Sequence, residues 1–439
     1  MEKPLDRASS QAEPDRPENS SPSLRASRHR VRDAVFACIL CVMLCGPAVM
    51  LVAERVFDLQ LPSWLTAEDA AFLSGTSNEI DLAGNASLDG FAAGSFQTSF
   101  DDAVGKCVPM KGTALMTTSA WQRGAIEASN ALFRWPCFLT NYDSWIVAVP
   151  SEGRLLELPP SWSQETMDNM GRVAEALSTL SERHPNVQVK AYLAPDSQNA
   201  SGVPTAGLLS NPLTYEQLRE AFLAHADADL WVDGQVTHEE FLQKWYKSDH
   251  HWNVLGAFQA YQRIATSLGL EGELLQDRGT VTVEGPSFYG SLARRGLDDD
   301  CGDRVLDLAF DDFPTFSVQI DGTPADAREL VEGPSSAVEW ADNRHANRYS
   351  EYFHGDYGQI TITNEESASE NELVLVADSY SNCMERFLAA HYRTTYVIDL
   401  RHSSVVIDEF LDEHPEVTDV VYLMRRTNFL RKTSIVASE

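Results

Sequence analysis

The sequence has few basic residues and few cysteines for its length. Its 439 residues include 34 Lys and Arg against 65 Asp and Glu, which gives a formal net charge of −31. A surface of this charge repels polyanions, so the composition argues against binding to nucleic acid through a basic face. Seven cysteines are too few for a disulfide scaffold. With 43% hydrophobic and 23% charged residues and no internal repeat, the chain has the composition of a globular protein rather than of a disordered or collagenous one.

The N-terminal region predicts a membrane anchor. Residues 1–33 are polar and rich in Ser and Pro, so we expect a disordered tail. The run from Ala34 to Ala53 has 20 residues without a charge, and a helix of about that length crosses a hydrocarbon core of ~30 Å. Basic residues precede the run, so the tail is expected in the cytoplasm and the rest of the chain outside it. These residues are Arg25, Arg28, Arg30 and Arg32.

Two alternatives to an uncleaved anchor are a cleaved signal sequence and a buried globular helix. A signal sequence has a shorter leader than the 33 residues found here, and a globular helix is rarely so free of polar residues. Both an uncleaved anchor and a cleaved signal sequence would place residues 54–439 outside the cytoplasm. Because residues 1–33 carry 7 Lys and Arg and 6 Asp and Glu, a net charge of +1, the remainder carries −32.

The cysteines divide between the predicted anchor and the exported part. Cys38, Cys41 and Cys45 lie within the apolar run and are expected to pack as small apolar residues. An oxidising compartment would allow the other four to form two disulfides, whose pairing the sequence leaves open. These four are Cys107, Cys137, Cys301 and Cys383.

The exported part predicts a linker and one α/β domain. Residues 54–106 are rich in Gly, Ala, Ser and Asp and suggest a linker or stalk, whereas 107–430 alternate strand-like and helix-like segments and 431–439 form a tail. This alternation predicts a parallel sheet with helices on both faces. A region dense in Gly, Pro and Asp at about 280–365 predicts a β-rich insertion. Strands are predicted at 145–149, 187–193, 230–232, 373–377, 395–400 and 420–423, and helices at 165–183 (N-cap Ser163), 215–225, 253–268 (N-cap Asn253), 381–391 and 404–413.

Ser379 is the first candidate for chemistry. It stands in Val-Ala-Asp-Ser-Tyr-Ser, after a predicted buried strand and before a predicted helix. Sites in open parallel sheets form at the carboxyl ends of strands, and helix N–H groups there favour a developing oxyanion. The alternative is structural, with Ser379 or Ser381 capping the helix and Asp378 ending the strand.

The second candidate is Asp249-His250-His251-Trp252. A serine nucleophile needs a base, and the base needs a carboxylate that fixes its tautomer. In an extended segment Asp249 and His251 point to the same side, while His250 faces away. Two alternatives remain open: a metal site formed by the histidines with Asp249, or an ordinary pair of surface histidines.

At these residues the sequence resembles the family named for its Asp-His-His-Trp signature, within the SGNH-hydrolase-like group that includes the extracytoplasmic alginate O-acetyltransferases. The resemblance covers residues 140–425 and follows four blocks in order. The blocks are Trp245–Ala257, Phe288–Leu292, Tyr349–Gly358 and Val376–Ser381.

The resemblance implies acyl transfer with Ser379 as nucleophile, His251 as base and Asp249 as orienting acid, without a cofactor or a metal. It further implies O-acetyl transfer to, or removal from, a cell-envelope or exported glycan. The implied setting is a bacterial cell membrane, with a single-pass anchor in the lipid bilayer, an extracytoplasmic catalytic domain and a membrane-bound O-acyltransferase as partner.

The chain departs from the family pattern in two places. Ala377 replaces a common Gly before Asp-Ser, and His354-Gly355-Asp356 replaces a frequent Gly-Gly-Asn. An ionised Asp cannot donate to an oxyanion as Asn does. The oxyanion or substrate contacts are therefore assigned to the backbone N–H of Ser379 together with candidates near it. These candidates are His354, Gly355, Asp356 and Trp252.

Two other function classes fit the same residues. The first is a non-catalytic glycan-binding or assembly protein on the same fold; the complete Asp249, His251 and Ser379 set argues against it, whereas the Asp at position 356 favours it. The second is a structural envelope protein that binds metal through its histidine pair. Bound zinc in the purified protein would identify that class.

Overall fold

The computed structural model describes residues 31–42, 45–46, 49, 87, 90–91, 94–99, 111–134, 138–139, 145–195, 211–298, 300–326, 340, 344–431 and 435–437. The chain divides into two compact units, one of residues 1–68 and 82–110 and one of residues 69–81 and 111–439. In the first unit, residues 31–42 are helical. Among the helices of the described residues, none has both the length and the apolar character that a membrane crossing requires. The predicted anchor at 34–53 extends over residues 43–44, 47–48 and 50–53, and these lie outside the described part, as does most of the predicted linker at 54–106.

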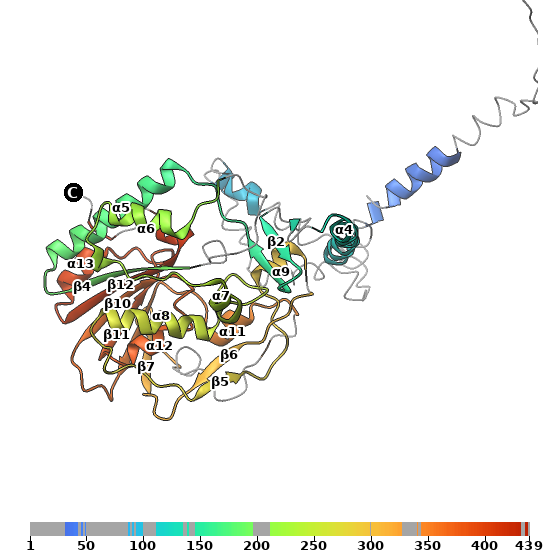
Figure 1. Ribbon diagram of the computed structural model, residues 1–439. Helices are drawn as coiled ribbons and strands as arrows, with labels where there is room; N and C mark the ends of the chain where they lie inside the picture. The colour runs from blue at the N-terminus through green and yellow to red at the C-terminus, as the bar shows by residue number, and fades with distance from the viewer. Residues whose placement is uncertain are drawn as a thin grey trace, which may run out of the picture. The chain divides into compact units, whose positions relative to one another are not determined.

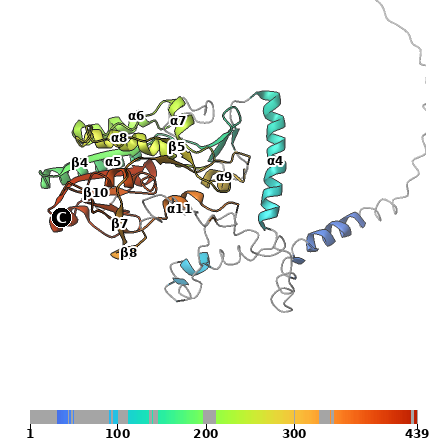
Figure 2. The same ribbon diagram turned by 90° about the horizontal axis from the view of Figure 1, so that it is seen from below.

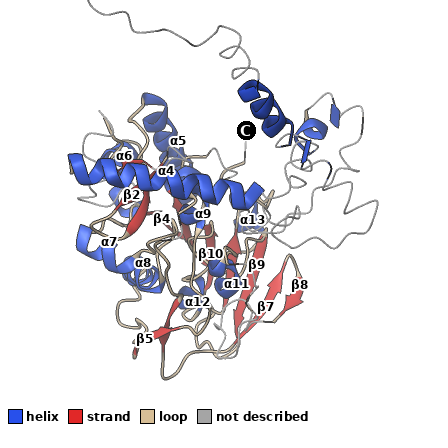
Figure 3. Cartoon of the chain, turned by 90° about the vertical axis from the view of Figure 1, so that its right-hand side faces the viewer, coloured by secondary structure: helices blue, strands red, loops and turns tan. Residues whose placement is uncertain are grey.

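The second unit is built on a mixed sheet. Within the described residues this sheet has seven strands in the order β4-β12-β10-β11-β9-β7-β8 (Figure 3). Strands β4, β12, β10 and β11 run parallel, whereas β9, β7 and β8 are added antiparallel at one side. The strands are β4 (Gln188–Ala194), β7 (Phe316–Ile320), β8 (Thr323–Ala325), β9 (Gln359–Asn364), β10 (Glu372–Ala377), β11 (Thr394–Ile398) and β12 (Val417–Arg425).

The parallel strands are buried on both faces. In β10, Leu373 and Leu375 join one hydrophobic cluster, while Val374 and Val376 join another on the opposite face. Helices cover the two faces, with α5, α6 and α13 on one and α8 and α12 on the other (Figure 1). This two-sided burial explains why the strands are continuous apolar runs. The helices are α5 (Gln164–Arg183), α6 (Tyr215–Leu223), α8 (Val254–Ser267), α12 (Glu385–Ala389) and α13 (Ile407–Glu413).

The two predicted N-caps are confirmed. The Ser163 side chain accepts from the Thr166 N–H at the start of α5. The Asn253 side chain accepts from the Leu255 and Gly256 N–H groups at the start of α8. Each cap satisfies donors that the first helical turn leaves without a backbone partner. The α8 cap has a second consequence, because it fixes the chain direction directly after His251 and Trp252.

Three predicted elements are present but differ from the expectation in their sheet partners or their bounds. The strand at 145–149 is β2 (Ile146–Val149), which pairs antiparallel with β1 (Phe138–Leu139) and β3 (Arg154–Glu157) in a separate small sheet. Region 280–365 is rich in strands, as predicted. The strands β5 (Gly279–Thr282) and β6 (Leu306–Ala309) form a separate ribbon, whereas β7, β8 and β9 extend the central sheet. The helix expected from residue 381 begins only at Glu385, after a turn.

Two smaller differences concern residues 228–232 and the C-terminus. Ala228–Leu230 form the 3₁₀ turn η3, and Trp231 makes an isolated bridge to Ala191 where a strand was expected. Ile435 in the expected tail is buried against the core of the second unit. The remaining helices are α4 (Lys111–Phe133), α7 (His238–Lys244), α9 (Ser291–Gly296), α11 (Arg348–Phe353) and α14 (Arg426–Phe429).

The small sheet and α4 frame one side of the second unit. Ile126 of α4 packs against the cluster that contains Ile146 and Leu292, and the Ser119 hydroxyl donates to the Leu297 carbonyl. Figure 2 shows α4 running beside α9. Since α9 also carries the residues that contact Asp249, this packing supports the candidate site from outside.

Glu157 joins the small sheet to the central one. It accepts from Arg295 of α9 and, at 2.6 Å, from Arg425 of β12. Burial by itself would raise the pKa of Glu157, but Arg425, His250 and Arg295 lower it from 4.5 to about 2. The folded state therefore favours the ionised carboxylate, and this contribution to stability is present above pH 4.5 and lost as the pH falls towards about 2.

We expect Glu157→Gln to lower the free energy of unfolding at pH 7 by on the order of 3 kcal/mol, which is the free energy that corresponds to the lowered pKa of Glu157. Urea unfolding at pH 7 and pH 3 would measure it. The variant should be less stable at pH 7 and lose less stability on acidification than the wild type. Glu216→Gln, which breaks an exposed pair with Arg219, serves as control. An acid dependence equal to that of the wild type would contradict the assignment.

Candidate active site

Ser379 directly follows β10, at the carboxyl end of the parallel part of the sheet, and is half-buried. The turn around it is held by Asp378, whose side chain accepts from the Tyr380 N–H, the Arg425 N–H and the Asn428 amide. Burial raises the pKa of this carboxyl group. Asp378 is thus a structural residue of the turn, and its contacts fix the position of Ser379.

Ser379 does not cap helix α12. The helix begins at Glu385, and its N-cap residue Met384 makes no side-chain capping bond. The hydroxyl in the turn that binds backbone belongs to Ser381, which donates to the Asp378 carbonyl at 3.1 Å. The capping alternative therefore fails for Ser379, whose hydroxyl instead bonds to an imidazole.

Asp249, His251 and Ser379 form one hydrogen-bonded chain. The Ser379 Oγ lies 2.9 Å from Nε2 of His251, and Nδ1 of the same ring lies 2.6 Å from Oδ1 of Asp249. Asp249 and His251 are almost fully buried. The structure thus brings together the three residues that the sequence analysis assigned to the nucleophile, the base and the orienting acid.

The segment that carries Asp249 and His251 bends, so the two side chains do not meet through the alternation of an extended chain. The Asp249 Oδ1 accepts from the His251 N–H at 3.0 Å, so the side chain closes a turn on its own backbone two residues on. The same oxygen contacts the His251 ring. One carboxylate oxygen therefore fixes both the backbone and the imidazole of the base.

The second oxygen of Asp249 is held by α9. The Ser291 N–H donates to Oδ2 at 2.6 Å, and a Cβ on Gly290 would come within 2.3 Å of the Asp249 Cβ. Position 290 therefore requires glycine for this approach. Burial alone would raise the pKa of Asp249, but His250, His251 and the hydrogen bonds hold it well below its ordinary value. The carboxylate is accordingly ionised.

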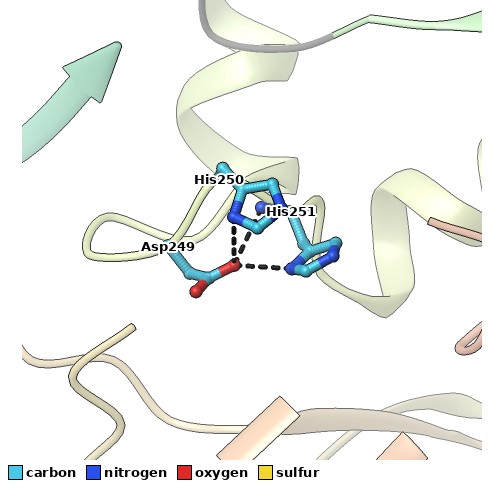
Figure 4. A group of neighbouring side chains, drawn as sticks. All are labelled: Asp249, His250 and His251. Atoms are coloured by element: carbon cyan, nitrogen blue, oxygen red, sulfur yellow. Dashed lines mark hydrogen bonds and ion pairs between the residues drawn. The ribbon is translucent and has the colours of Figure 1, made fainter. Parts of the chain in front are cut away.

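His250 lies beside this chain. Its Nδ1 lies 2.6 Å from the Ser291 Oγ and 3.5 Å from the Asp249 Oδ1, and the two imidazole centroids are 3.9 Å apart. Figure 4 shows one Asp249 oxygen facing both histidines. Burial, with His251 as the next contribution, holds the pKa of His250 well below its ordinary value.

Asp249, His250 and His251 also lie close enough together to be considered as metal ligands. One ligand atom from each of Asp249, His250 and His251 lies within 4.8 Å of the others. However, the Asp249 carboxylate already accepts two N–H groups besides the His251 ring, and the Nδ1 of His250 already contacts Ser291. The donor set therefore fits a hydrogen-bonded triad better than a coordination sphere.

Tyr349 of α11 supports both the base and the nucleophile. Its ring is stacked on His251, with centroids 4.0 Å apart and an interplanar angle of 2°. Its hydroxyl donates to the Ser379 carbonyl at 2.8 Å. The sequence analysis placed Tyr349 in a motif block without giving it a role. Ser291 was missed in the same way, since nothing in the sequence pairs it with Asp249.

The four candidates for oxyanion or substrate contacts differ in their surroundings. Trp252 is fully buried and its indole N–H donates to the Tyr380 carbonyl, so it belongs to the packing around the site. The His354 ring is buried against Glu385. Asp356 forms an ion pair with Arg401 at 2.8 Å, so its carboxylate is an acceptor for the guanidinium group. Gly355 lies between His354 and Asp356 in the sequence, and its carbonyl oxygen contacts Nδ1 of His354.

Within the described residues of the second unit, Cys301 and Cys383 are free thiols. Cys383 is buried behind the serine, 3.4 Å from the Tyr349 hydroxyl, and burial raises its pKa to about 12. It is therefore an unreactive packing residue. Cys107 and Cys137 lie outside the described residues.

Comparison with solved structures gives the class of fold. A DHHW family protein from Eubacterium siraeum superposes with a TM-score of 0.53 at 19% identity, over 68% of this chain and 96% of that one. Bacillus cereus PatB1 with a sulfonyl adduct gives a TM-score of 0.51 at 21% identity, over 65% of this chain and 97% of that one. A further structure of PatB1 gives 0.50 at 19% identity, over 67% and 96%.

These likenesses establish a shared fold, and the resemblance to the DHHW group that the sequence motifs predict is confirmed at that level. No family model and no curated protein sequence matches the chain. The class is therefore an α/β fold with a mostly parallel central sheet, similar to the folds of the DHHW family protein and of PatB1. Its chemistry has to be argued from the residues of the site.

Proposed function

We propose that this protein is a Ser-His-Asp acyl-transfer enzyme, an O-acetyltransferase or acetylesterase acting on a cell-envelope or exported polysaccharide. The observation that carries the proposal is the hydrogen-bonded chain from Asp249 through His251 to Ser379. Each member has the surroundings that its role needs: an ionised, buried acid, an oriented imidazole and a half-buried hydroxyl.

The reaction would proceed in two steps. The Ser379 Oγ attacks the carbonyl carbon of an acetyl ester while Nε2 of His251 takes its proton, and the alcohol leaves with that proton as the C–O bond breaks. An acceptor hydroxyl then attacks the acetyl-enzyme, gives its proton to His251 and releases Ser379. With a glycan hydroxyl as acceptor the result is transfer, and with water it is hydrolysis. Asp249 stabilises the imidazolium in both steps.

The oxyanion contacts are proposed to come from backbone N–H groups, with that of Ser379 first. The alternative donor at position 356 is an aspartate paired with Arg401, which does not donate while ionised. Residues 354–356 lie next to the serine turn, since the Asn382 amide donates to the His354 carbonyl at 3.2 Å. A backbone donor from that segment, such as the Gly355 N–H, would complete the oxyanion hole.

The cellular setting is part of the proposal. The charge-free run at 34–53, preceded by arginines, supports a single-pass anchor with residues 54–439 outside the cytoplasm. A membrane-bound O-acyltransferase that exports acetyl groups would supply the donor. The net charge of −32 for residues 34–439 favours a neutral or amino-sugar glycan over a strongly anionic polymer.

The test uses the full-length chain in detergent with an activated acetyl ester and a sulfonyl fluoride. PatB1 is known with a sulfonyl adduct, which makes this probe suitable. We expect turnover of the ester, and a single adduct by intact mass that peptide mapping places on Ser379. Neutral glycan oligosaccharides added to the acetyl-enzyme would then separate transfer from hydrolysis. A folded protein that gives neither turnover nor adduct would favour the non-catalytic glycan-binding alternative.

A further inference from the structure

His354 adopts a backbone conformation that glycine normally occupies. Its φ is +64° and its ψ is 170°. Residues with a Cβ enter this region only where the surrounding structure holds them there. Because a Cβ is strained in this conformation, contacts of the histidine side chain have to offset the strain.

The contacts of His354 are buried and directed at the segment that carries the nucleophile. We call residues 378–384, between β10 and α12, the serine loop. The His354 ring is almost fully buried, its Nε2 lies 2.7 Å from Oε1 of Glu385, and its Nδ1 lies 2.7 Å from the Gly355 carbonyl. Glu385 is the first residue of α12 and is 0% exposed. A buried histidine thus binds a buried carboxylate directly after the serine loop.

Burial by itself would lower the pKa of His354, but the Glu385 carboxylate raises it above its ordinary value. This direction favours an ion pair, as expected of two buried groups that neutralise each other. The second oxygen of Glu385, Oε2, is buried without a hydrogen-bond partner among the described residues. His354 is therefore the partner on which the Glu385 carboxylate depends.

The same segment holds the serine loop at two further points. The Asn382 amide donates to the His354 carbonyl, and the Tyr349 hydroxyl, one helix turn earlier, donates to the Ser379 carbonyl. Tyr349 also stacks on His251. Residues 349–354 therefore contact the loop at its beginning and its middle, and contact Glu385 directly after its end.

We propose that His354 and Glu385 form a positioning pair, which locks residues 354–356 and the serine loop in the geometry that acyl transfer requires. This inference deepens the proposed function and rests on it. Neither residue is assigned contact with the substrate. Their effect would pass through the placement of Ser379 and of the backbone donors in residues 354–356.

The test compares His354→Gly, Glu385→Gln and the double variant in the full-length chain. Glycine suits the backbone at position 354 but removes the ring. We expect His354→Gly to fold and to lower kcat for the acetyl ester by roughly 10- to 100-fold, with a smaller change in KM, as misplacement by about 1 Å does. Glu385→Gln keeps an acceptor and should lose only about threefold, and the double variant should lose no more than His354→Gly, because the two residues act as one unit.

The control is His391→Gly. It removes a histidine that bonds to Tyr261 just beyond the other end of α12 and should retain the wild-type kcat. Amide hydrogen exchange of peptides covering 354–358 and 378–385 gives a readout that needs no activity. We expect faster exchange in both peptides for His354→Gly and not for His391→Gly.

Each outcome decides between the proposals. Exchange and kcat that remain at wild-type values in a folded His354→Gly protein would overturn the pair. If His354→Gly exchanges faster but keeps the wild-type kcat, the contact is only structural and its role in positioning is overturned. That role is also overturned if the kcat losses of the two single variants multiply in the double variant. If the wild type shows neither turnover nor adduct, the proposed function fails, while the exchange measurements still decide whether the pair holds the loop.

Discussion

Replacing Ser379 with alanine is expected to abolish ester turnover and the acyl adduct, with a fall in kcat of at least about a thousandfold. The substitution removes the attacking oxygen and its 2.9 Å hydrogen bond to His251. The Ser379 carbonyl, which accepts from Tyr349, belongs to the backbone and is retained. Since the side chain is small and half-buried, the free energy of unfolding should change by less than about 1 kcal/mol. Intact mass after exposure to the acetyl ester, together with thermal unfolding, measures both effects.

Ser381→Ala provides the matched control, because the two serines share one turn. The Ser381 hydroxyl is buried and donates to the Asp378 carbonyl, so its loss should lower stability while the adduct still forms. The two variants should therefore show opposite patterns, one stable and inactive, the other less stable and reactive. An adduct on the folded Ser379→Ala protein would mean that another residue is the nucleophile.

The parallel part of the fold could be predicted from the sequence because both faces of each strand are buried. Leu373-Val-Leu-Val-Ala377 is a continuous apolar run, and such runs in alternation with helices indicate a parallel sheet. The antiparallel part follows a different pattern. In β7 and β9 buried residues alternate with more exposed ones, which indicates strands but leaves their partners open. That they extend the same sheet depends on tertiary packing.

The three residues of the triad could be predicted from the sequence, but the contacts that hold them in place could not. Alternation along a strand was the stated reason for placing Asp249 and His251 on one side, whereas the structure brings them together through a turn that the Asp249 side chain itself closes. The supports come from distant segments: Ser291 lies 42 residues from Asp249, and Tyr349 lies 30 residues before Ser379. No local pattern encodes such pairings, and only the motif order indicated that these blocks belong to one site.

Two of the candidates for substrate contact are bound to other residues of the protein. Trp252 is part of the signature, yet its ring is buried and its indole N–H is used by Tyr380. Asp356 stands where an amide was expected, and it forms an ion pair with Arg401. A motif indicates that a residue matters to the site but does not distinguish contact with the substrate from support of the neighbouring chain.

Replacing Asp249 with asparagine is expected to leave the fold intact and to lower kcat by about 10³- to 10⁴-fold, the loss typical of a triad that loses its acid. The amide keeps one oxygen to accept from the Ser291 N–H. Its N–H₂ group then takes the place of Oδ1, so the bond from the His251 N–H is lost and stability falls somewhat. The N–H₂ group donates to Nδ1 of His251, which selects the tautomer that carries its proton on Nε2, where it cannot accept the proton of Ser379. Steady-state kinetics with the acetyl ester and the rate of sulfonyl adduct formation should fall together.

Asp408→Asn is a control of the same chemistry at a distance from the site. Asp408 is a largely buried acid of α13 that lies 3.0 Å from a histidine nitrogen, that of His184, and it also pairs with Arg183. Its replacement should lower stability, because these partners lower the pKa of Asp408 against the opposing effect of burial, and leave kcat unchanged. If Asp249→Asn and Asp408→Asn lost activity equally, the loss in Asp249→Asn would be due to lower stability and not to the role of Asp249 in the site. A folded Asp249→Asn protein with wild-type kcat would show that another group orients His251, and would remove the acid from the proposed mechanism.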